Sequence, residues 1–256
     1  MSQVSQASEV IRTQALSKRF GGVVVADNID LDLKRGRIVG LIGPNGAGKT
    51  SLFNLISGAI APDSGRIMLN GHAIGHLPMH ARARLGISRS WQHNRLFPSL
   101  TVLDNLLLAE RTHQDKAMSG AGPRSSAHDK AAARARAMAQ LEKVHMTQAA
   151  HRLPTELSYG KQKLIGLARV LMNDGDCLLL DEPMAGVEGP AYEAIQTVVR
   201  GEAAAGRAIC VVEHNISFIK DLCDVAVFMF AGRIINTGTI DEMVRSPELT
   251  ELYFGT

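Results

Sequence analysis

The sequence contains few cysteines and no long apolar segment. The three cysteines among its 256 residues lie in or beside apolar runs and lack the C-x-x-C spacing of zinc or redox sites. We therefore expect Cys177, Cys210 and Cys223 to be buried, reduced thiols, as is usual in the cytosol. No apolar run approaches the roughly 20 residues of a membrane span, and MSQVSQASEV lacks the apolar core of a secretory signal. The chain is not expected to cross a membrane by itself.

The sequence also has little excess charge of either sign. A formal net charge of +3 is too small to indicate a nucleic-acid partner. The cluster Arg82, Arg84, Arg89 and Arg95 is interpreted as a solvated or partner-facing surface. With 45% hydrophobic and 21% charged residues, the composition is that of a globular protein and excludes disordered and collagen-like classes.

The apolar segments that are present predict an α/β fold. IVGLI (38–42) is apolar without alternation and precedes a loop and a helical segment, which is typical of a buried parallel strand. Gly58 is predicted to end that helix. Further strands are predicted at CLLLDEP, AICVVEH and VAVFMF, separated by helical patterns. The segments EVIRTQAL, NIDLDLKRG, a hairpin through Asn70-Gly71, and LGISRSWQ predict an antiparallel portion beside the buried strand.

The middle of the chain has helical patterns instead. TVLDNLLLAE, KAAARARAMAQLEKV and the segment beginning LSYGKQ predict an α-helical sub-domain at 95–172, inserted into a core formed by 9–94 and 173–256. Segment 113–129 is rich in Gly, Ser and Ala and is predicted to be a mobile loop without a role in chemistry. The whole chain, 1–256, is predicted to be one discontinuous domain.

The stretch GPNGAGKT (43–50) carries the strongest chemical signal. It matches G-x-x-x-x-G-K-[ST] in the strand-to-helix context that the motif requires, and this P-loop predicts a P-loop NTPase core with a mostly parallel sheet. Its glycines let backbone N–H groups surround phosphates, Lys49 reaches the terminal phosphates, and Thr50 offers a hydroxyl to Mg²⁺. The predicted nucleotide-binding residues here are Gly43, Pro44, Asn45, Gly46, Ala47, Gly48, Lys49, Thr50 and Ser51.

Polar residues follow several predicted buried strands. Asp181 ends the strand in LLLDEP and can hold Mg²⁺, while the adjacent Glu182 can polarise an attacking water. Gln92 and His214 also follow apolar strands, at the sheet edge where ligands gather in α/β proteins. The other eight histidines are interpreted as ordinary surface or core residues.

The stretch LSYGKQ (157–162) holds no acid, metal ligand or nucleophile. Ser158 stands where a helix N-cap belongs, and Leu164, Ile165, Ala168, Leu171 and Met172 share one face of the predicted helix. A helix start exposes N–H groups and a positive dipole end that favour an anion. Taken alone, the stretch is more typical of an ordinary capped helix, because N-cap serines are common.

Together the P-loop, Gln92, LSYGKQ, LLLDEP and His214, in that order, resemble the ATP-binding subunit of an ABC transporter. LSYGKQ is similar to that family's signature, usually LSGGQ. The resemblance implies that Phe20 stacks on adenine, that Gln92 senses Mg²⁺ and couples to a membrane subunit, and that His214 contacts the γ-phosphate. It further implies that Ser158 and Gly160 close on ATP held by a second subunit. Lys49, Glu182 and His214 are then the predicted catalytic residues, with Thr50, Gln92 and Asp181 around Mg²⁺.

Within that family, GISRSWQHNRLFPSLTVLDNLLLA, LSYGKQKL, VVEHN and GTIDEMVRSPELTELYFG resemble the ATPases of branched-chain amino acid importers. This implies a peripheral ATPase at the cytoplasmic face of the cell membrane. Its partners would be an identical or homologous ATPase, membrane permease subunits and, indirectly, a solute-binding protein, with no nucleic acid. Arg89 and segment 92–100 are the predicted permease-docking surface.

The sequence departs from the family pattern in two places. Glu188 stands where an aspartate is common after DEP, and the signature has Tyr159 and Lys161 where Gly and Gln are commonest. Neither change removes a catalytic group. Both bear on the interface between two ATPase subunits.

Several alternatives stay open from the sequence. Urea or short-amide importers and a lipopolysaccharide exporter are related possibilities, and a soluble ABC-type ATPase of DNA repair or translation is another. The soluble class usually has two cassettes or a long coiled coil, whereas this chain has one P-loop and no sustained heptads. A P-loop kinase or a GTPase is a third possibility. The GTPase would need an N/T-K-x-D motif, which is missing from the sequence. The transported solute is not readable from these residues.

Overall fold

The structure is a computed structural model that describes residues 8–92, 95–114 and 127–254. The chain divides into two compact units. The first comprises Met1–Arg89, Gly175–Glu182 and Val199–Thr256, and the second comprises Ser90–Asp174 and Pro183–Val198. Segment 183–198, which the sequence analysis placed in the core, thus groups with the helical unit. Most of the loop predicted at 113–129 lies outside the described residues.

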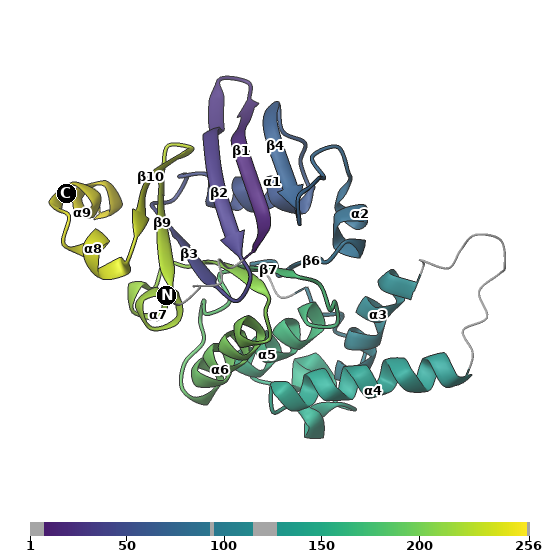
Figure 1. Ribbon diagram of the computed structural model, residues 1–256. Helices are drawn as coiled ribbons and strands as arrows, with labels where there is room; N and C mark the ends of the chain where they lie inside the picture. The colour runs from purple at the N-terminus through teal and green to yellow at the C-terminus, as the bar shows by residue number, and fades with distance from the viewer. Residues whose placement is uncertain (1–7, 93–94, 115–126, 255–256) are drawn as a thin grey trace, which may run out of the picture. The chain divides into compact units, whose positions relative to one another are not determined.

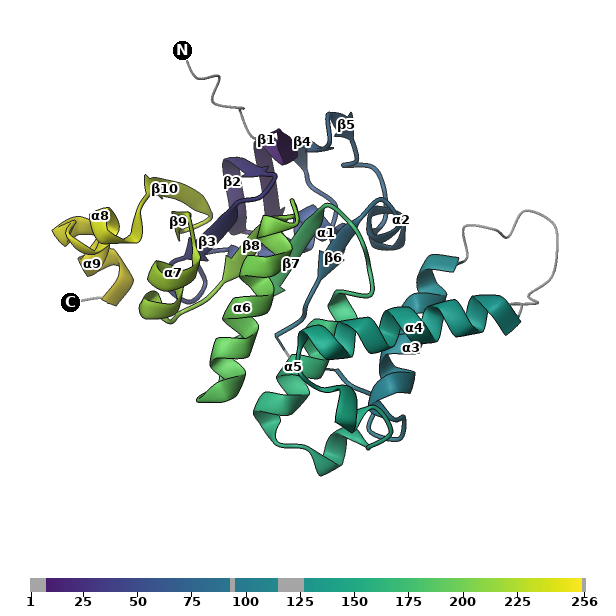
Figure 2. The ribbon, with the colours of Figure 1, turned by 60° about the horizontal axis from the view of Figure 1, so that its bottom comes forward.

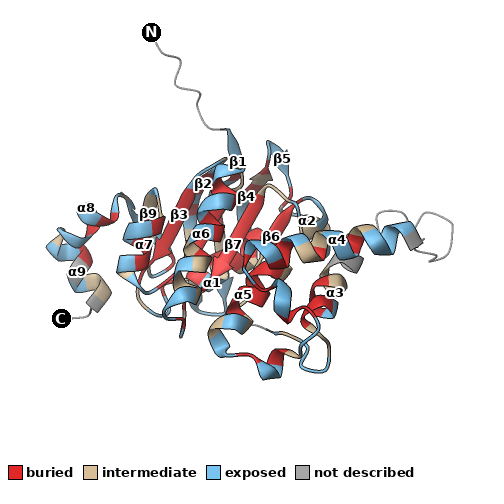
Figure 3. Ribbon diagram, turned by 90° about the horizontal axis from the view of Figure 1, so that it is seen from below, coloured by how far each residue is buried: buried red, intermediate tan, exposed pale blue. Residues whose placement is uncertain are grey.

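A six-stranded sheet forms the centre of the first unit, in the order β10-β9-β3-β8-β7-β6. All neighbouring strands pair in parallel except β10, which pairs antiparallel with β9. Every residue of β3, β7 and β8 is buried, and Figure 3 shows β3 and β7 in red. Apolar runs without alternation therefore became central parallel strands, as predicted. The strands are β3 (Ile38–Ile42), β6 (Ile87–Arg89), β7 (Cys177–Asp181), β8 (Ala208–Val212), β9 (Val225–Phe230) and β10 (Arg233–Gly238).

The first unit also contains a four-stranded antiparallel sheet, in the order β2-β1-β4-β5. Its members are β1 (Glu9–Phe20), β2 (Val23–Lys34), β4 (Ser64–Leu69) and β5 (His72–Ala73). The β4–β5 hairpin turns at Asn70 and Gly71, both with positive φ, as the sequence predicted. The predicted strand LGISRSWQ is different, because only Ile87–Arg89 form a strand, β6, which pairs in parallel with β7 and does not belong to the antiparallel portion.

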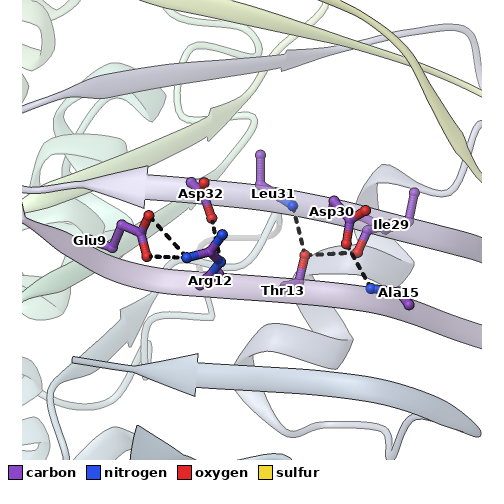
Figure 4. Close-up of polar contacts among 8 residues, drawn as sticks. All are labelled: Glu9, Arg12, Thr13, Ala15, Ile29, Asp30, Leu31 and Asp32. Carbon is purple, nitrogen blue, oxygen red and sulfur yellow. Dashed lines mark hydrogen bonds and ion pairs between the residues drawn. The ribbon is translucent and has the colours of Figure 1, made fainter. Parts of the chain in front are cut away.

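Buried and exposed polar groups join β1 to β2 (Figure 4). The Thr13 hydroxyl donates to the carbonyl of Ile29 at 3.0 Å and accepts from the Leu31 N–H at 2.9 Å. The irregularity at Ala15, whose φ is 47°, is closed by Asp30, whose carboxylate accepts the Ala15 N–H at 2.7 Å. Side chains thus satisfy backbone groups where the register shifts, which keeps the long ribbon paired.

Within the described residues of the first unit, five α-helices lie wholly inside it. Figure 1 shows α8 and α9 beside β10 near the C-terminal end, and α8 contacts both of these elements. Gly58, in the left-handed conformation, ends α1 as predicted. The helices are α1 (Lys49–Ser57), α2 (Met79–Arg84), α7 (Ile216–Leu222), α8 (Ile240–Val244) and α9 (Pro247–Phe254).

The second unit is helical, as predicted. Helices α3, α4 and α5 pack against one another and lie together in Figure 2. The apolar face predicted for α5, from Leu164 to Met172, is buried. The elements are α3 (Val102–Gln114), α4 (Ala127–Lys143), η2 (Thr147–Ala149), η3 (Pro154–Glu156) and α5 (Tyr159–Val170). Helix α6 (Pro190–Ala204) begins in this unit and continues into the first.

The arginine cluster is only in part the surface that the sequence suggested, because Arg84 and Arg95 are exposed whereas Arg82 and the Arg89 side chain are buried. Arg82 is 1% exposed, and its guanidinium donates to the carbonyls of Leu55, Ile56, Gly75 and Leu77 at 2.6–3.0 Å. It binds carbonyls at the C-terminal end of α1, where a positive charge is favoured by the helix dipole. The side chain of Arg89 is also buried, so two members of the cluster are interior groups.

The cysteines and the helix lengths can be compared with the sequence-based expectations. The three cysteines are free, with Cys177 and Cys210 buried and Cys223 partly buried. Burial raises the pKa of Cys177 to about 12, so this thiol is protonated at neutral pH. None of the helices in the described part of the chain is long and apolar enough to cross a membrane.

Candidate functional site

The loop between β3 and α1 has a backbone that only glycine accommodates at key positions. Gly43 and Gly48 have φ of 148° and 103°. A Cβ at Gly43 would collide with the backbone carbonyl of Met229, and one at Gly48 with the carbonyl of Val25. The loop can therefore turn tightly into α1, whose N-cap is Gly48 and has no side-chain cap. The N–H groups at this helix start are those that a phosphate can bind.

Lys49 opens α1 and its side chain returns into the loop. The residue is 6% exposed, and Nζ donates to the carbonyls of Gly43 and Pro44 at 2.6 and 3.0 Å. Burial lowers the pKa of Lys49, while Glu182 and Asp181 raise it. A desolvated ammonium held inside a ring of backbone groups is suited to neutralise a terminal phosphate.

Asp181, the last residue of β7, is a buried carboxylate. Its Oδ2 lies 3.2 Å from Nη2 of Arg89, and the two side chains are 4% and 5% exposed. Burial raises the pKa of Asp181, while Arg89 and Lys49 lower it. Sequence reasoning identified the aspartate but placed Arg89 on a docking surface, which is wrong. Arg89 instead belongs to the interior of the site.

Glu182 and His214 meet at the carboxyl ends of β7 and β8. The Oε1 of Glu182 lies 3.1 Å from Nε2 of His214, and the Glu182 backbone has a φ of 48°, rare for a residue with a side chain. Its N–H donates to the carbonyl of Val212 at 2.9 Å, which holds this strained backbone in place. A carboxylate fixed beside an imidazole can accept a proton from water or orient it.

One contact at this site has no signal in the sequence. The hydroxyl of Tyr253, in α9, donates to the backbone carbonyl of His214 at 3.1 Å. The Tyr253 ring lies 6.3 Å from that of Phe228 in β9. Burial raises the pKa of Tyr253, and Glu213 raises it further. Residues 39 positions apart in the chain thus meet only through the fold.

The protein groups that could face a cation are oxygen ligands. Among the described residues, no group of three or more histidine, cysteine, aspartate or glutamate side chains could hold a metal ion. Mg²⁺ in nucleotide sites is bound by one or two protein oxygens together with phosphate oxygens and water. The Asp181 carboxylate and the exposed hydroxyl of Thr50, in the first turn of α1, fit that donor set.

The structure also describes Phe20 and Gln92, two further predicted residues. Phe20, at the end of β1, is 51% exposed, and Nζ of Lys18 lies 5.3 Å from its ring centroid. An exposed aromatic face of this kind can stack on a base. Gln92 belongs to the second unit, where its backbone carbonyl accepts from Lys163 Nζ at 3.4 Å.

The start of α5 is also in the second unit. Ser158 is the N-cap residue, but its side chain makes no capping hydrogen bond. Tyr159 packs against Gly186, because a Cβ built at Gly186 would lie 3.0 Å from the Tyr159 ring. A Cβ at Gly160 would lie 3.1 Å from that of Ala191. The helix start and the segment after Asp181–Glu182 are therefore packed together within this unit.

Family comparison agrees with this arrangement. Residues 26–185, more than half of the chain, match the model of the family described as ABC transporter. The chain belongs to the ABC transporter family, and its fold is that of a P-loop ATPase cassette. It is an ATP-binding subunit of an ABC transporter and an ATPase.

Individual relatives cover nearly the whole chain. It is 34% identical to a probable ABC transporter ATP-binding protein of Azorhizobium caulinodans, over 99% of this chain and 85% of that protein. It is 31% identical to the high-affinity branched-chain amino acid transport ATP-binding protein LivG of Salmonella typhimurium, over 96% and 98%. A crystal structure of an ATP-binding cassette of an ABC transporter, in its ADP conformation, superimposes with a TM-score of 0.84 at 28% identity, covering 97% and 99%.

Proposed function

We propose that the chain is the ATP-hydrolysing subunit of an importer for branched-chain or other amino acids, positioned at the cytoplasmic face of the cell membrane. The observation that carries the substrate class is 31% identity to LivG across 96% of this chain. The chemical part of the proposal rests on the contact between Glu182 and His214 at 3.1 Å. The adjoining buried Lys49 and Asp181 support it.

The mechanism follows from charges and positions. Residues 43–51 bind the phosphates through backbone N–H groups, and Lys49 stabilises charge that develops on the γ-phosphate. Glu182 orients the attacking water, and His214 fixes the carboxylate and contacts the γ-phosphate. Phe20 stacks on adenine. Thr50 and Asp181 would hold Mg²⁺, which would neutralise phosphate charge when bound, and the family resemblance adds Gln92 to these residues.

The proposed assembly contains a second ATPase subunit, identical or homologous, together with membrane permease subunits and a solute-binding protein. Ser158 and Gly160 would close on ATP bound to the partner's P-loop. The uncapped start of α5 supports this role, because its N–H groups are not bound by the Ser158 side chain. Segment 92–100 is the proposed permease-docking surface without Arg89, whose guanidinium is buried.

Substitution of Glu182 tests the catalytic part. Glu182→Gln keeps the shape of the side chain but removes the carboxylate, so ATP should still bind while turnover falls by about 10²- to 10⁴-fold, the usual contribution of a general base. Equilibrium binding and phosphate release measure the two effects. Hydrolysis at the unaltered rate would refute the role of Glu182.

Uptake measurements test the substrate. Cells lacking this subunit should lose import of labelled leucine, isoleucine or valine, and regain it with the unaltered chain but not with Glu182→Gln. Loss of urea uptake alone, or of lipopolysaccharide export, would replace the amino-acid assignment with one of those related systems.

A further inference from the structure

Arg89 lies at the end of β6, where three elements of the first unit converge. Its Nη1 donates to Oδ1 of Asn54 at 2.6 Å and to Oγ of Ser57 at 3.1 Å, and both residues belong to α1. Its Nη2 donates to Oδ2 of Asp181 at 3.2 Å. The guanidinium also lies 5.7 Å from the ring centroid of Phe53. One side chain thus connects the P-loop helix to the carboxylate that ends β7.

The burial of this pair shows why the connection is rigid. With exposed fractions of 5% and 4%, neither charge is solvated, so each depends on the other and on nearby polar groups. A guanidinium is planar and donates in fixed directions within that plane. Its Nη1 can therefore bond to α1 while its Nη2 bonds to Asp181. A lysine could keep the charge but could not make both sets of bonds with the same geometry.

We propose that Arg89 is a positioning residue that fixes the Asp181 carboxylate relative to α1 and thereby sets how strongly Mg²⁺ tightens ATP binding. This rests on the proposed function, because it assumes that Asp181 contributes to the cation site. Groups that hold a metal-binding carboxylate in place commonly change metal affinity by about 10- to 100-fold when they are removed. Arg89 does not itself contact nucleotide in this scheme.

The experiment measures ATP affinity rather than turnover. The full chain carrying Glu182→Gln serves as parent, and its Kd for ATP is determined with Mg²⁺ and with a chelator. Mg²⁺ tightens ATP binding by the ratio of the Kd with chelator to the Kd with Mg²⁺. Arg89→Lys, added to this parent, should reduce that ratio by about tenfold or more. Metal-free ATP binding should change by less than about twofold, because residues 43–51 are unaltered. Circular dichroism and thermal unfolding confirm that the variant is folded.

Three further variants keep the test decisive. Asn54→Ala removes one anchor of Arg89 and leaves both charges, so it should lower the same ratio by a smaller factor even if Arg89→Lys does not fold. Ser57→Ala should act in the same direction. Arg37→Gln is the matched control, because Arg37 forms an exposed ion pair with Asp224 at 3.0 Å and should leave the ratio unchanged.

The outcomes separate the two proposals. A folded Arg89→Lys with the parental ratio, or an unchanged ratio in Asn54→Ala when Arg89→Lys is unfolded, would overturn the positioning role alone. An equal loss of ATP binding with and without Mg²⁺ would also overturn it, since Arg89 would then support the fold of the P-loop. If the parent itself bound no ATP, or bound it independently of Mg²⁺, the proposed function would fail instead.

Discussion

Helices α1 and α5 both begin without a side-chain cap, but the surroundings of their first residues differ. Helix α1 follows a left-handed Gly48, and its first residue, Lys49, is buried with its ammonium inside the loop. Helix α5 follows an extended Ser158, and this start is largely exposed. By contrast, Asn215 caps α7 and Thr239 caps α8 with a complete capping box. A missing cap does not by itself mark a phosphate site, because α2 also begins without one; the sequence motifs at α1 and α5 make that assignment.

The difference between α1 and α5 indicates how each would bind an anion. The start of α1 carries its own glycine loop and lysine, so this chain supplies a complete cradle. The start of α5 offers N–H groups beside the exposed Ser158, Tyr159 and Lys161, and no glycine loop precedes it in the sequence. Under the proposed assembly, its phosphate comes from the partner subunit. The predictions below test this distinction, from the largest expected effect to the smallest.

The largest effect is expected from a bulky cation at the start of α5. Ser158→Arg should leave ATP binding to the isolated chain within about twofold, yet reduce hydrolysis by the assembled pair to background, because the side chain fills the proposed closing surface. Binding by isothermal calorimetry and phosphate release measure the two properties. Loss of ATP binding by the single chain would show that α5 serves the chain's own fold or nucleotide.

Lys49→Ala should weaken binding to the single chain itself. A hydrogen bond to a charged group contributes about 1.5–3 kcal/mol, so the Kd for ATP should rise by about 10- to 150-fold. Lys161→Ala at the exposed start of α5 is the matched control and should leave that Kd unchanged. Equal effects of the two lysines would remove the proposed distinction between the helix starts.

The glycines at the two starts should differ in their effect on stability. Gly48→Ala forces a residue with a side chain into a φ of 103° and against the Val25 carbonyl. Strain of about 1–3 kcal/mol should lower the Tm by roughly 2–4 °C per kcal/mol. Gly160→Ala needs only a slight movement from the Ala191 methyl, so its Tm should stay within about 2 °C. Scanning calorimetry measures both Tm values. A larger loss of Tm in Gly160→Ala than in Gly48→Ala would contradict the structure at these positions.

The smallest effect separates a capped helix from an uncapped one. The Asn215 side chain accepts the Phe218 N–H at 3.1 Å, so Asn215→Ala should reduce the free energy of unfolding by about 1 kcal/mol. Ser158→Ala should change it by less than about 0.5 kcal/mol, since no capping bond is lost. Chemical denaturation measures both, and a comparable loss at Ser158 would show that its hydroxyl stabilises α5 in solution.

Most of the fold was predictable because its signals are local. The run of apolar residues at 38–42, the glycine loop and the following helix specify a buried strand, a tight turn and a helix from neighbouring residues alone. The Asn70-Gly71 turn follows from the positive φ that both residues tolerate. Strand β6 was assigned to the wrong portion, because its three residues contain no signal for whether β7 or an antiparallel strand would pair with them.

The candidate site was predictable only in part. Lys49, Asp181, Glu182 and His214 were identified from motifs, and the structure brings Glu182 and His214 into contact. The partners of these groups were missed, since Arg89 read as one member of a surface cluster and Tyr253 lies near the other end of the chain. No local pattern distinguishes an arginine that points to solvent from one that is covered by distant segments.

The sequence by itself determined the succession of strands, turns and helices along the chain, the phosphate loop and the family to which the chain belongs. These properties depend on backbone preferences and side-chain chemistry within a few neighbouring residues. Only the tertiary structure decided which charges are buried and what they bind, including Arg82 at the end of α1, Arg89 beside Asp181, and Tyr253 on the carbonyl of His214. Burial depends on which remote segments cover a residue, and that is established only when the chain has folded.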